Sequence, residues 1–572
     1  MQPDEIVRRI LEGRGIVSEE EISEFLSEKP KLIYDPLLLP GMEAGADFVL
    51  DKLSLGNHIC VYGDYDVDGI CGSALLILFI RKVAQAMGSS SEISFYIPAR
   101  IEEGYGLNKG ALKTILERGA EAVITVDCGS VSVDEVSYAR EIGLDIMITD
   151  HHDPNLDSLP DCVHINPKLA GGYPFEKLAG AGVAFKLCRA LLDRIAGESY
   201  AELRVYLNSL VDLVCVATIA DVMPLVDENR TIVKYGLNAL KKESRKAFRE
   251  LLSVSGVKPE KLNVREVAFG LSPRINALGR LDHAADGVEL FLTDDAKQIR
   301  ETVLRMNELN MQRRQIQSEC FDKCMELYRD DLDEEGTTRH MFLLLKPDGA
   351  YEGVAGIVAG KVREETGLPC AVLSATSDEK GYLKGSARSS GQLNLIDLLK
   401  NHSELFERFG GHFAAAGFVL KEENEERLKE ALSDDVRAML KEMPDLLDNA
   451  KIAELDIEMK DICYDLVEAV EKLAPFGNGN PKPLFGINVP IEEITNFSRL
   501  GKDGKHLKFK ADGISFIKFG VSEKDFSDLE TAIQTSEPKA SIRILGCPEI
   551  NEWNGNRYLQ ILVEQIEISG IF

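Results

Sequence analysis

The stretch "VYGDYDVDGI", residues 61–70, decides the fold, because it joins an apolar run to three closely spaced carboxylates. Asp64, Asp66 and Asp68 stand at alternate positions directly after the run that begins at His58. A continuous apolar run that ends in turn-forming residues is typical of a strand buried on both faces. Because the three carboxylates repel one another, we expect a divalent cation to lie among them.

The apolar runs that follow along the chain predict the other strands of the same sheet. They are "SEISFYI" (91–97), "AEAVITV" (120–126), "LDIMIT" (144–149) and "DCVHIN" (161–166). Helical patterns separate these runs, and strands that alternate with helices form mostly parallel sheets covered on both faces. The sequence therefore predicts an α/β domain.

Further acids and two histidines stand where these apolar segments end. They are Asp127 after the run at 120–126, Asp150, His151 and His152 after the run at 144–149, and Asp221 in "VCVATIADVMPL". The carboxyl ends of parallel strands meet at one edge of the sheet, where ligands bind in a crevice. We therefore expect these side chains to converge with the three aspartates on one cleft.

The types of these side chains indicate which ion they bind. Carboxylate oxygens with one or two imidazoles and no thiolate suit Mn²⁺ or Mg²⁺, and the histidines favour Mn²⁺. So many acids can hold two ions roughly 3.5–4 Å apart, the arrangement used for displacement at phosphorus. A lone aspartate after a strand is usually a helix cap, but several at one edge favour a metal site. The predicted chemistry is hydrolysis of a phosphoester or phosphoanhydride.

Composition limits where such a protein works and what it binds. The 572 residues carry a net charge of −29, which argues against coating nucleic acid through a global positive field but leaves a local basic groove open. Eleven cysteines without a CxxC pair predict reduced thiols and a cytoplasmic protein. The longest apolar run, "CGSALLILFI" (71–80), is too short to span a bilayer and predicts a buried helix, so we expect no membrane partner.

Several motifs now resemble those of a known family. "GDYDVDG", "VDCGS", "TDHHD" and "IADVMPL" resemble, in this order, the four motifs of the DHH phosphoesterase superfamily. More narrowly, the chain resembles the RecJ family of single-stranded-DNA-specific 5′→3′ exonucleases from about residue 36 to its end. The segments that carry this resemblance are "LSPRINALGRL" (271–281), "GVAGIVAGKV" (353–362), "GSARSS" (385–390), "FGGHFAAAGF" (409–418) and "LAPFGNGNPKPLF" (473–485).

The resemblance implies a role for each matching residue. The metal ligands would be Asp64, Asp66, Asp68, Asp127, His151 and Asp221. Asp150 would support them, and His152 would stabilise charge on the scissile phosphate. The implied contacts to the substrate are Arg274, Arg280, Arg388, Gly410, Gly411 and His412. For "FGGHFAAAGF" the residues alone also allow a helix start whose small side chains pack tightly.

The resemblance also implies a fold, in which a parallel-sheet DHH domain is joined by a long helix to a DHH-associated α/β domain, followed by a C-terminal OB-like β-barrel. The expected parts are an N-terminal helical segment (1–45), a DHH catalytic domain (46–235), a helical connector (236–337), a DHH-associated substrate-binding domain (338–445), a helical linker (446–483) and an OB-like domain (484–572).

The connector contains the pattern of one long helix, with Thr293 as its expected N-cap. Its seam runs through Ile299, Val303, Met306, Asn310, Arg313, Gln317, Cys320, Cys324 and Leu327. A helix that is apolar at its ends and polar at its centre suits a strut that crosses solvent between two domains.

In the last segment, "HLKFKADGISFIKFG" predicts a hairpin around an Asp-Gly turn. The residues nearby allow two interpretations and comprise Lys502, Lys505, Lys508, Lys510, Lys518, Phe497 and Trp553. In the first, lysines follow the phosphates of a single strand and aromatic rings stack on its bases. In the second, the phenylalanines form the core of a small barrel and the lysines are solvated.

The function implied is a metal-dependent exonuclease that hydrolyses single-stranded DNA 5′→3′, passes the strand between two lobes and releases mononucleotides, in DNA repair and recombination. Single-strand-binding protein and a helicase are the implied protein partners. One alternative is a small-substrate phosphodiesterase of the same superfamily, acting on oligonucleotides or cyclic dinucleotides. The other is a catalytically silent replication scaffold, which the intact acids and histidines disfavour.

Overall fold

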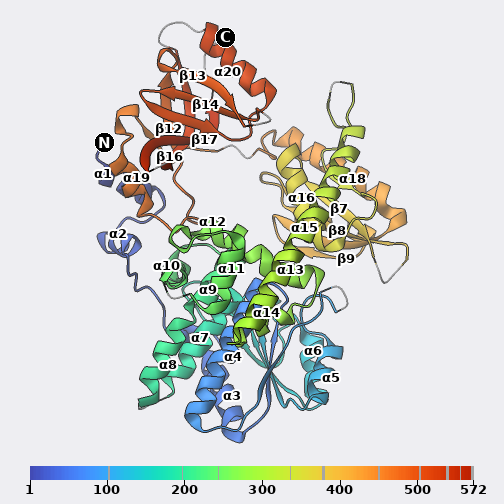
Figure 1. Cartoon of the computed structure of the whole chain (residues 1–572). Helices are drawn as coiled ribbons and strands as arrows, with labels where there is room; N and C mark the ends of the chain where they lie inside the picture. The colour runs from blue at the N-terminus through green and yellow to red at the C-terminus, as the bar shows by residue number, and fades with distance from the viewer. Residues whose placement is uncertain are drawn as a thin grey trace. The chain divides into compact units, whose positions relative to one another are not determined.

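The computed structural model describes the chain apart from residues 101–102, 196–197, 243, 335, 377–379, 449–450, 502–503, 536–539, 554 and 568–572. The described residues fall into two compact units, residues 1–272 with 451–572, and residues 273–450 (Figure 1).

The first unit contains a five-stranded parallel sheet with the order β2-β1-β3-β4-β5. Its strands are β1 (Ile59–Gly63), β2 (Ile93–Tyr96), β3 (Ala122–Val126), β4 (Asp145–Thr149) and β5 (Val163–Ile165). Each strand lies within one of the five predicted runs, so the prediction of a parallel α/β sheet is confirmed.

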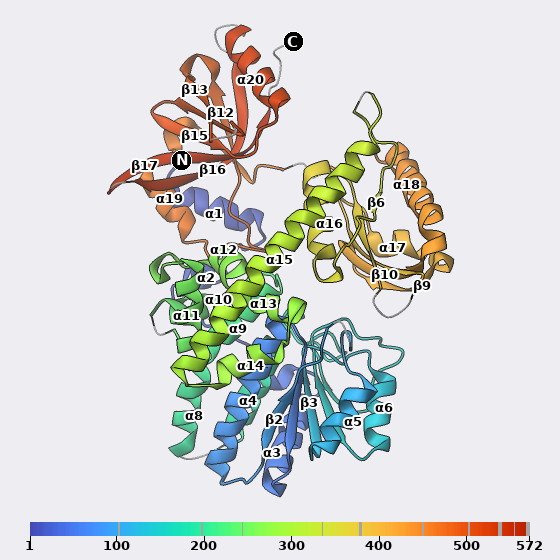
Figure 2. The same ribbon diagram turned by 45° about the vertical axis from the view of Figure 1, so that its right-hand side comes forward.

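Helices cover both faces of this sheet (Figure 2). They are α3 (Met42–Leu55), α4 (Val67–Met87) and α7 (Gly180–Asp193) on one face, and α5 (Lys109–Glu117) and α6 (Val133–Glu141) on the other. Tyr62 and Val123 of the sheet are fully buried against Leu112 of α5 and Val136 of α6. The run at 71–80 lies inside α4, where we predicted a buried helix.

The chain continues in this unit with the helices α8 (Glu198–Ser209), α9 (Val211–Ala220), α10 (Asp227–Lys242), α11 (Lys246–Ser255) and the short α12 (Val264–Glu266). Asp221 ends an apolar segment as predicted, but that segment is the helix α9 rather than a strand of the sheet. A short, continuous apolar run does not distinguish a buried strand from a buried helix, and here the helix forms.

One helical stretch, Ser199–Ala220, is apolar and long enough to cross a membrane by length and composition. Within it, 61% of the most apolar window is buried inside the protein. A core helix passes the same test, and α9 packs closely on α4, α7 and α10, so this stretch is weak evidence for a membrane span.

The N-terminal helices α1 (Pro3–Gly13) and α2 (Glu19–Leu26) pack against the C-terminal part of the chain. Ile6, Ile10 and Leu11 share one apolar core with Leu466 and Val470 of α19 (Tyr464–Glu471). Two segments at opposite ends of the sequence are therefore parts of the same unit.

A seven-stranded sheet forms the C-terminal domain, with the order β11-β12-β16-β17-β15-β14-β13. Its strands are β11 (Leu455–Ile457), β12 (Phe485–Pro490), β13 (Thr495–Leu500), β14 (His506–Ala511), β15 (Ile514–Lys518), β16 (Ser541–Trp553) and β17 (Asn556–Glu567), and α20 (Glu523–Thr535) packs on them. The predicted hairpin is present as β14 and β15, with Asp512 and Gly513 at positive φ in its turn. β11 lies within the predicted helical linker, because it pairs with β12 and begins the sheet early.

The aromatic side chains of this sheet support its interpretation as a barrel with a phenylalanine core. Phe509 and Phe516 are fully buried, and Phe497 lies on Phe526 with ring centroids 4.8 Å apart. Lys508 and Lys510 alternate with buried residues of β14 and lie on its other face. Lys502 and the side chain of Trp553 lie outside the described residues.

The second unit contains a mixed sheet with the order β6-β7-β8-β10-β9. Its strands are β6 (Leu343–Leu345), β7 (Cys370–Ala375), β8 (Tyr382–Arg388), β9 (Phe406–Gly411) and β10 (Ala415–Lys421). Its helices are most of α13 (Ser272–Leu281), α14 (Ala285–Leu292), α15 (Ala296–Asp330), α16 (Glu352–Thr366), α17 (Leu395–Lys400) and α18 (Glu425–Glu442). The segment "FGGHFAAAGF" forms β9, a turn and β10, so its interpretation as a helix start was wrong.

The long helix is present as α15, but three of its predicted details were wrong. Asp295 is the N-cap, because its carboxylate accepts hydrogen bonds from Lys297 N and Gln298 N, whereas Thr293 ends α14. Asn310 and Gln317 are buried rather than solvated, and the guanidinium of Arg313 donates to both side chains. Leu327 is exposed. The periodicity identified the seam, but it did not show what covers the polar centre.

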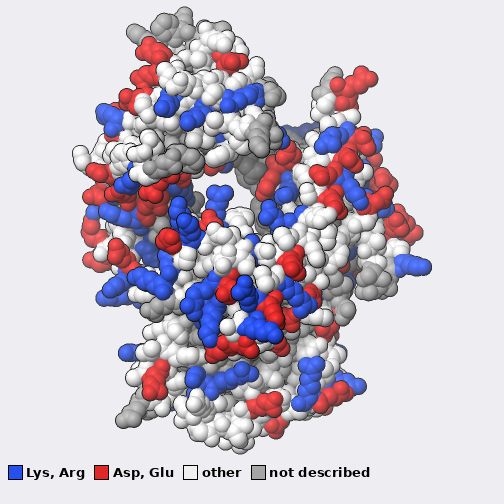
Figure 3. Space-filling model, in the orientation of Figure 1, with Lys and Arg blue, Asp and Glu red and all other residues white. Residues whose placement is uncertain are grey.

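Acidic and basic side chains are interspersed on the face of the molecule shown in Figure 3. Local fields, rather than the total charge, decide what each surface binds, because charges farther apart than about 8 Å are largely screened at physiological salt.

Candidate metal centre

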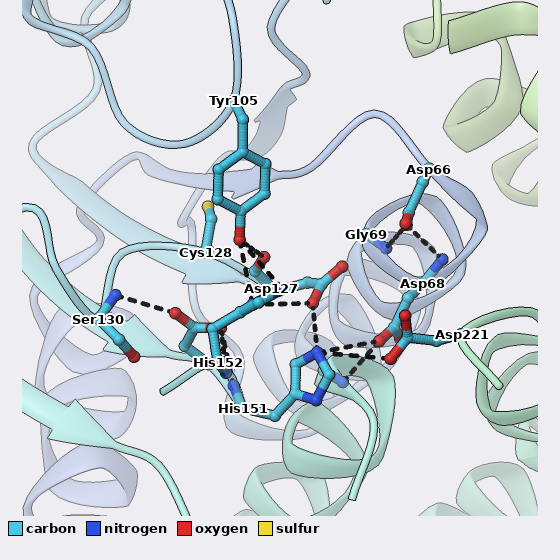
Figure 4. A network of polar contacts seen from close by, with 12 residues as sticks. Asp66, Asp68, Gly69, Tyr105, Asp127, Cys128, Ser130, His151, His152 and Asp221 are labelled. Carbon is cyan, nitrogen blue, oxygen red and sulfur yellow. Dashed lines mark hydrogen bonds and ion pairs between the residues drawn. The ribbon is translucent and has the colours of Figure 1, made fainter. Parts of the chain in front are cut away.

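The first three aspartates follow β1 where the chain passes into α4, and Figure 4 shows Asp66 and Asp68 at the start of that helix. Asp66 is the N-cap of α4, and one of its oxygens accepts hydrogen bonds from Asp68 N at 2.8 Å and Gly69 N at 3.2 Å. The two oxygens of Asp68 accept from Gly180 N and Ala181 N at the start of α7, each at 2.7 Å. The helix N-termini thus hold two of the three carboxylates in fixed positions.

Asp127 and His151 come from the ends of the next two strands. Asp127 is buried at φ +65°, and its Oδ1 lies 3.0 Å from Nε2 of His151. The same nitrogen lies 3.6 Å from Asp221 Oδ2 and 3.8 Å from Asp68 Oδ2. One imidazole nitrogen therefore faces three carboxylates from three different segments. Asp68 and Asp127 lie at the strand edge as predicted, whereas Asp221 reaches the same place from the end of α9.

Asp150 and His152 form a second layer beside this group. Asp150 accepts hydrogen bonds from Ser130 N at 2.9 Å and His151 N at 2.7 Å, and its Oδ1 lies 2.9 Å from His152 Nδ1. Burial alone would raise the pKa of Asp150, but the hydrogen bond and charge of His152 hold it below its usual range. Burial opposes the charged form of His152, yet Asp150 raises its pKa to about 9.

The pKa values of four other carboxylates are shifted in the opposite direction. Burial, reinforced by the neighbouring acids, raises the pKa of Asp68 to about 7 and that of Asp221 to about 8. The same causes raise the pKa values of Asp64 and Asp127 well above their usual range. Burial and the charge of His152 lower the pKa of His151 to about 3, so His151 is a neutral imidazole that can donate a lone pair.

The donor atoms of this group fit a divalent cation. Four buried atoms of this group have no hydrogen-bond partner among the residues that the structure describes, namely Asp64 Oδ1, Asp127 Oδ1, His151 Nε2 and Asp221 Oδ2. Three overlapping groups each bring their ligand atoms within 4.8 Å, and they are Asp64–Asp66–Asp127, Asp127–His151–His152 and Asp68–His151–Asp221. Buried polar atoms are normally satisfied, so a cluster of unsatisfied oxygens around a neutral imidazole indicates a binding site for Mn²⁺ or Mg²⁺.

The structure adds residues to this site that the sequence did not indicate. The hydroxyl of Tyr105 lies 3.0 Å from His152 Nδ1 and donates to Asp127 O at 3.2 Å. Asn166 donates to Ser130 Oγ at 2.9 Å and to the carbonyl of His152 at 2.8 Å. Tyr105 stands between two glycines in "EEGYGLN", and an aromatic side chain in such a loop is the signal that could have identified it.

The substrate residues implied by the resemblance lie in the second unit. Arg388, at the end of β8, is paired in register with Ala415 of β10, and Gly411 of β9 is paired with Ala416. The sheet therefore brings Arg388, Gly410, Gly411 and His412 to one end of neighbouring strands. The two arginines on α13 have partners there: Arg274 Nε donates to Asn307 Oδ1 at 3.0 Å, and Arg280 Nη1 donates to Gly353 O at 2.6 Å.

Family models match three parts of the chain. They are the DHH family N-terminal domain over residues 58–218, the DHHA1 domain over residues 340–439 and the RecJ OB domain over residues 453–565. With the parallel sheet and the acids and histidines gathered at its edge, these matches define the class of protein, a DHH phosphoesterase.

Two curated relatives named "Single-stranded-DNA-specific exonuclease RecJ" align along almost the whole chain. The one from Bacillus subtilis is 34% identical over 99% of this chain and 68% of the relative, and the one from Escherichia coli is 30% identical over 98% and 95%. The chain therefore belongs to the RecJ family. A solved structure of RecJ from Thermus thermophilus in complex with Mn²⁺ has a TM-score of 0.79 at 27% identity and covers 99% of this chain and 76% of that chain. The corresponding complex with Mg²⁺ has a TM-score of 0.74 at 25% identity, over 99% and 75%.

Proposed function

We propose that this protein is a metal-dependent exonuclease that hydrolyses the phosphodiester bonds of single-stranded DNA from the 5′ end and releases mononucleotides. The observation that carries the proposal is the set of buried atoms on Asp64, Asp127, His151 and Asp221 that have no hydrogen-bond partner in the described part of the chain. Without a cation, such a cluster only destabilises the fold. The relatives' shared name, single-stranded-DNA-specific exonuclease, supports the choice of substrate.

Each residue of the site has a role in this proposal. Asp64, Asp66, Asp68, Asp127, His151 and Asp221 hold the cations. Bound there, two ions would lower the pKa of a water molecule and take up charge on the phosphoryl oxygens. Asp150 keeps the imidazole of His152 charged and fixed, so that His152 donates to an oxygen of the scissile phosphate. The hydroxyl of Tyr105 lies beside the same nitrogen of the ring, and its aromatic ring packs edge-on against the imidazole, which also helps to fix it.

The second unit supplies the contacts to the strand. Arg388 presents a half-buried guanidinium that donates to Ala387 O at 2.8 Å and keeps further N–H groups for a phosphate. The backbone at Gly410 and Gly411 and the side chain of His412 are exposed beside it. Arg274 and Arg280 contact the phosphate backbone in this proposal.

Degradation of end-labelled DNA tests the direction and the substrate. With Mn²⁺, a single strand labelled at its 5′ end should lose the label as a mononucleotide at early times, whereas a 3′ label should stay on shortened strands. EDTA should abolish both reactions. Cleavage of dinucleotides or pyrophosphate without attack on the long strand would instead indicate a small-substrate phosphodiesterase, and no cleavage of any substrate would indicate a scaffold.

Gly356→Ala is expected to weaken the use of single-stranded DNA without destabilising the fold. A Cβ at Gly356 of α16 would lie 2.7 Å from Arg388 Nη2 and 2.7 Å from Ser386 Oγ, so the guanidinium must move. Losing a hydrogen bond from a charged donor should lower kcat/KM about tenfold. Alanine is also a better helix former than glycine, so the melting temperature should not fall.

Gly360→Ala is the matched control for this variant, because its Cβ would lie 4.0 Å from Arg388 Cγ and displace nothing. Steady-state kinetics on a labelled single strand should separate the two variants. If Gly356→Ala retains the wild-type kcat/KM, Arg388 does not contact the substrate as we propose.

The cellular context follows from this activity. An enzyme that removes nucleotides from single strands needs them exposed, so we propose that it works in DNA repair and recombination with a helicase that unwinds duplex and with single-strand-binding protein. We also propose that it acts in the cytoplasm, where the eleven cysteines, all free in the structure, stay reduced.

A further inference from the structure

The helix that leads to Asp221 ends in an uncommon way. α9 closes in a Schellman motif, in which Met223 N donates to Thr218 O at 3.1 Å and Val222 N donates to Ile219 O at 3.2 Å. Val222 is the left-handed residue of this motif, with φ +55°. Glycine usually occupies that position, because a side chain there is strained and a β-branched one is strained most. Strained residues of this kind persist only where their surroundings hold them.

A turn from a distant part of the chain contacts this strained residue. Residues 477–480, the clamp turn, belong to the motif "LAPFGNGNPKPLF", for which the proposed function gives no role. The side chain of Asn478 donates from Nδ2 to Val222 O at 2.7 Å across 256 positions of sequence. The carbonyl of Asn478 accepts from Leu225 N, also at 2.7 Å. Asn478 of the clamp turn therefore forms two hydrogen bonds with the loop after Asp221.

Hydrogen bonds fix the conformation of the clamp turn and its position on the neighbouring chain segments. Gly477 and Asn480 exchange backbone hydrogen bonds of 2.9 and 3.1 Å across it. Asn480 Nδ2 donates to Leu473 O at 2.9 Å and Pro475 O at 2.8 Å. Arg230 of α10 donates to Leu473 O at 2.9 Å. The turn is therefore a rigid element that presents Asn478 in a defined position.

The direction of the Asp221 carboxylate depends on the conformation of the backbone at Val222. Its Oδ2 is buried, lies 3.6 Å from His151 Nε2 and has no hydrogen-bond partner among the described residues, so no hydrogen bond of that atom orients the carboxylate. We propose that Asn478 is a positioning residue for Asp221, acting by holding Val222 in its left-handed conformation. The inference rests on the proposed function, which makes Asp221 a metal ligand, and it assigns a role to the clamp turn that precedes β12.

A purely structural role for the clamp turn predicts different consequences. Asn478 and Val222 are both exposed, so water can replace the hydrogen bond between them at little expense to the stability of the fold. Positioning of a metal ligand, in contrast, depends on the angle at which the carboxylate leaves the backbone. The proposal therefore predicts a loss of metal affinity without an equal loss of thermal stability.

The test compares Mn²⁺ binding by the full chain, measured from the loss of the free Mn²⁺ signal in electron paramagnetic resonance. Asn478→Ala should raise the Kd for Mn²⁺ about tenfold, as removal of residues that orient metal ligands does. Its melting temperature in EDTA should stay within about 3 °C of wild type. Its exonuclease kcat should fall at limiting Mn²⁺ and recover at saturating Mn²⁺.

Two further variants test whether Asn478 affects Mn²⁺ binding through Val222. Val222→Gly removes the strain, so the double variant Asn478→Ala/Val222→Gly should bind Mn²⁺ nearly as tightly as wild type. Asn424→Ala is the matched control, because Asn424 also donates from Nδ2 to a backbone carbonyl, that of Leu405 at 3.1 Å, and lies in the other unit. It should leave Mn²⁺ binding unchanged.

The outcomes separate this inference from the proposed function. If Asn478→Ala binds Mn²⁺ as wild type does, or if the double variant remains as weak as Asn478→Ala, the positioning role is overturned and the exonuclease assignment stands. If the wild-type chain binds no Mn²⁺, the proposed function fails, and the inference fails with it.

Discussion

Asp127→Asn is expected to abolish the exonuclease activity while making the metal-free protein more stable. Loss of a ligand should remove several kcal/mol of transition-state stabilisation, roughly a thousandfold in rate. In the absence of metal, however, Asp127 is buried among other acids, and burial and Asp68 raise its pKa well above the usual range. Asparagine retains the size and tolerates the φ of +65°, and it removes a carboxyl group whose ionisation is opposed by burial and by the neighbouring acids.

The two effects are measured separately, by release of nucleotides from labelled single-stranded DNA with Mn²⁺ and by the melting temperature in EDTA. Asp161→Asn is the matched control, because Asp161 lies in the same domain with an exposed side chain paired with Arg140. It should change neither quantity appreciably. A less stable Asp127→Asn protein in EDTA would show that Asp127 is a structural residue, and an active one would remove it from the metal centre.

The sequence predicted most of this metal centre because one geometric rule places it. These residues follow β1, β3 and β4, which are neighbours in one parallel sheet and therefore end at the same edge. They are the aspartates at 64, 66 and 68, Asp127 and His151. Asp221 also converges on the site as predicted. The apolar segment that it ends is the helix α9 rather than a strand, and the two could not be told apart because α9 is as uniformly apolar as a buried strand. Tyr105 was missed because no periodicity marks a side chain that reaches the site from a loop.

Contacts between segments that are far apart in the sequence could not be predicted, for a different reason. Apolar spacing predicts that the N-terminal helices have a buried face, but not that Ile6 and Leu11 pack beside Leu466. In the same way, "LAPFGNGNPKPLF" reads as a turn-rich segment, while its contact with Val222 depends on how the whole first unit folds. Local patterns identify elements and faces, whereas partners far apart in sequence require the three-dimensional arrangement.

Glu228→Gln is expected to cause the largest loss of stability of any single change considered, about 3–5 kcal/mol. Glu228 and Lys186 form an ion pair in which both side chains are fully buried. Burial lowers the pKa of Lys186 to about 8 even beside Glu228, so without the carboxylate its charge would be left uncompensated in the core. Lys186 also donates to Tyr34 O at 2.8 Å, and Glu228 accepts from Tyr34 N at 3.2 Å. The melting temperature measures the stability, and hydrogen exchange at Tyr34 reports release of the N-terminal segment.

The double variant Lys186→Met/Glu228→Gln shows whether the single variant is unstable because a buried charge is left uncompensated or because hydrogen bonds are lost. The carbonyl oxygen of glutamine still accepts from the backbone N–H of Tyr34, its amide nitrogen donates to the hydroxyl oxygen of Tyr173, and methionine fills the space of the lysine chain without its charge. Replacing both members of a buried pair is often neutral, so most of the stability lost in Glu228→Gln should return. If the double variant is as unstable as the single one, the hydrogen bonds of Glu228 and Lys186, rather than their charges, hold Tyr34 and the segment around it on the catalytic domain.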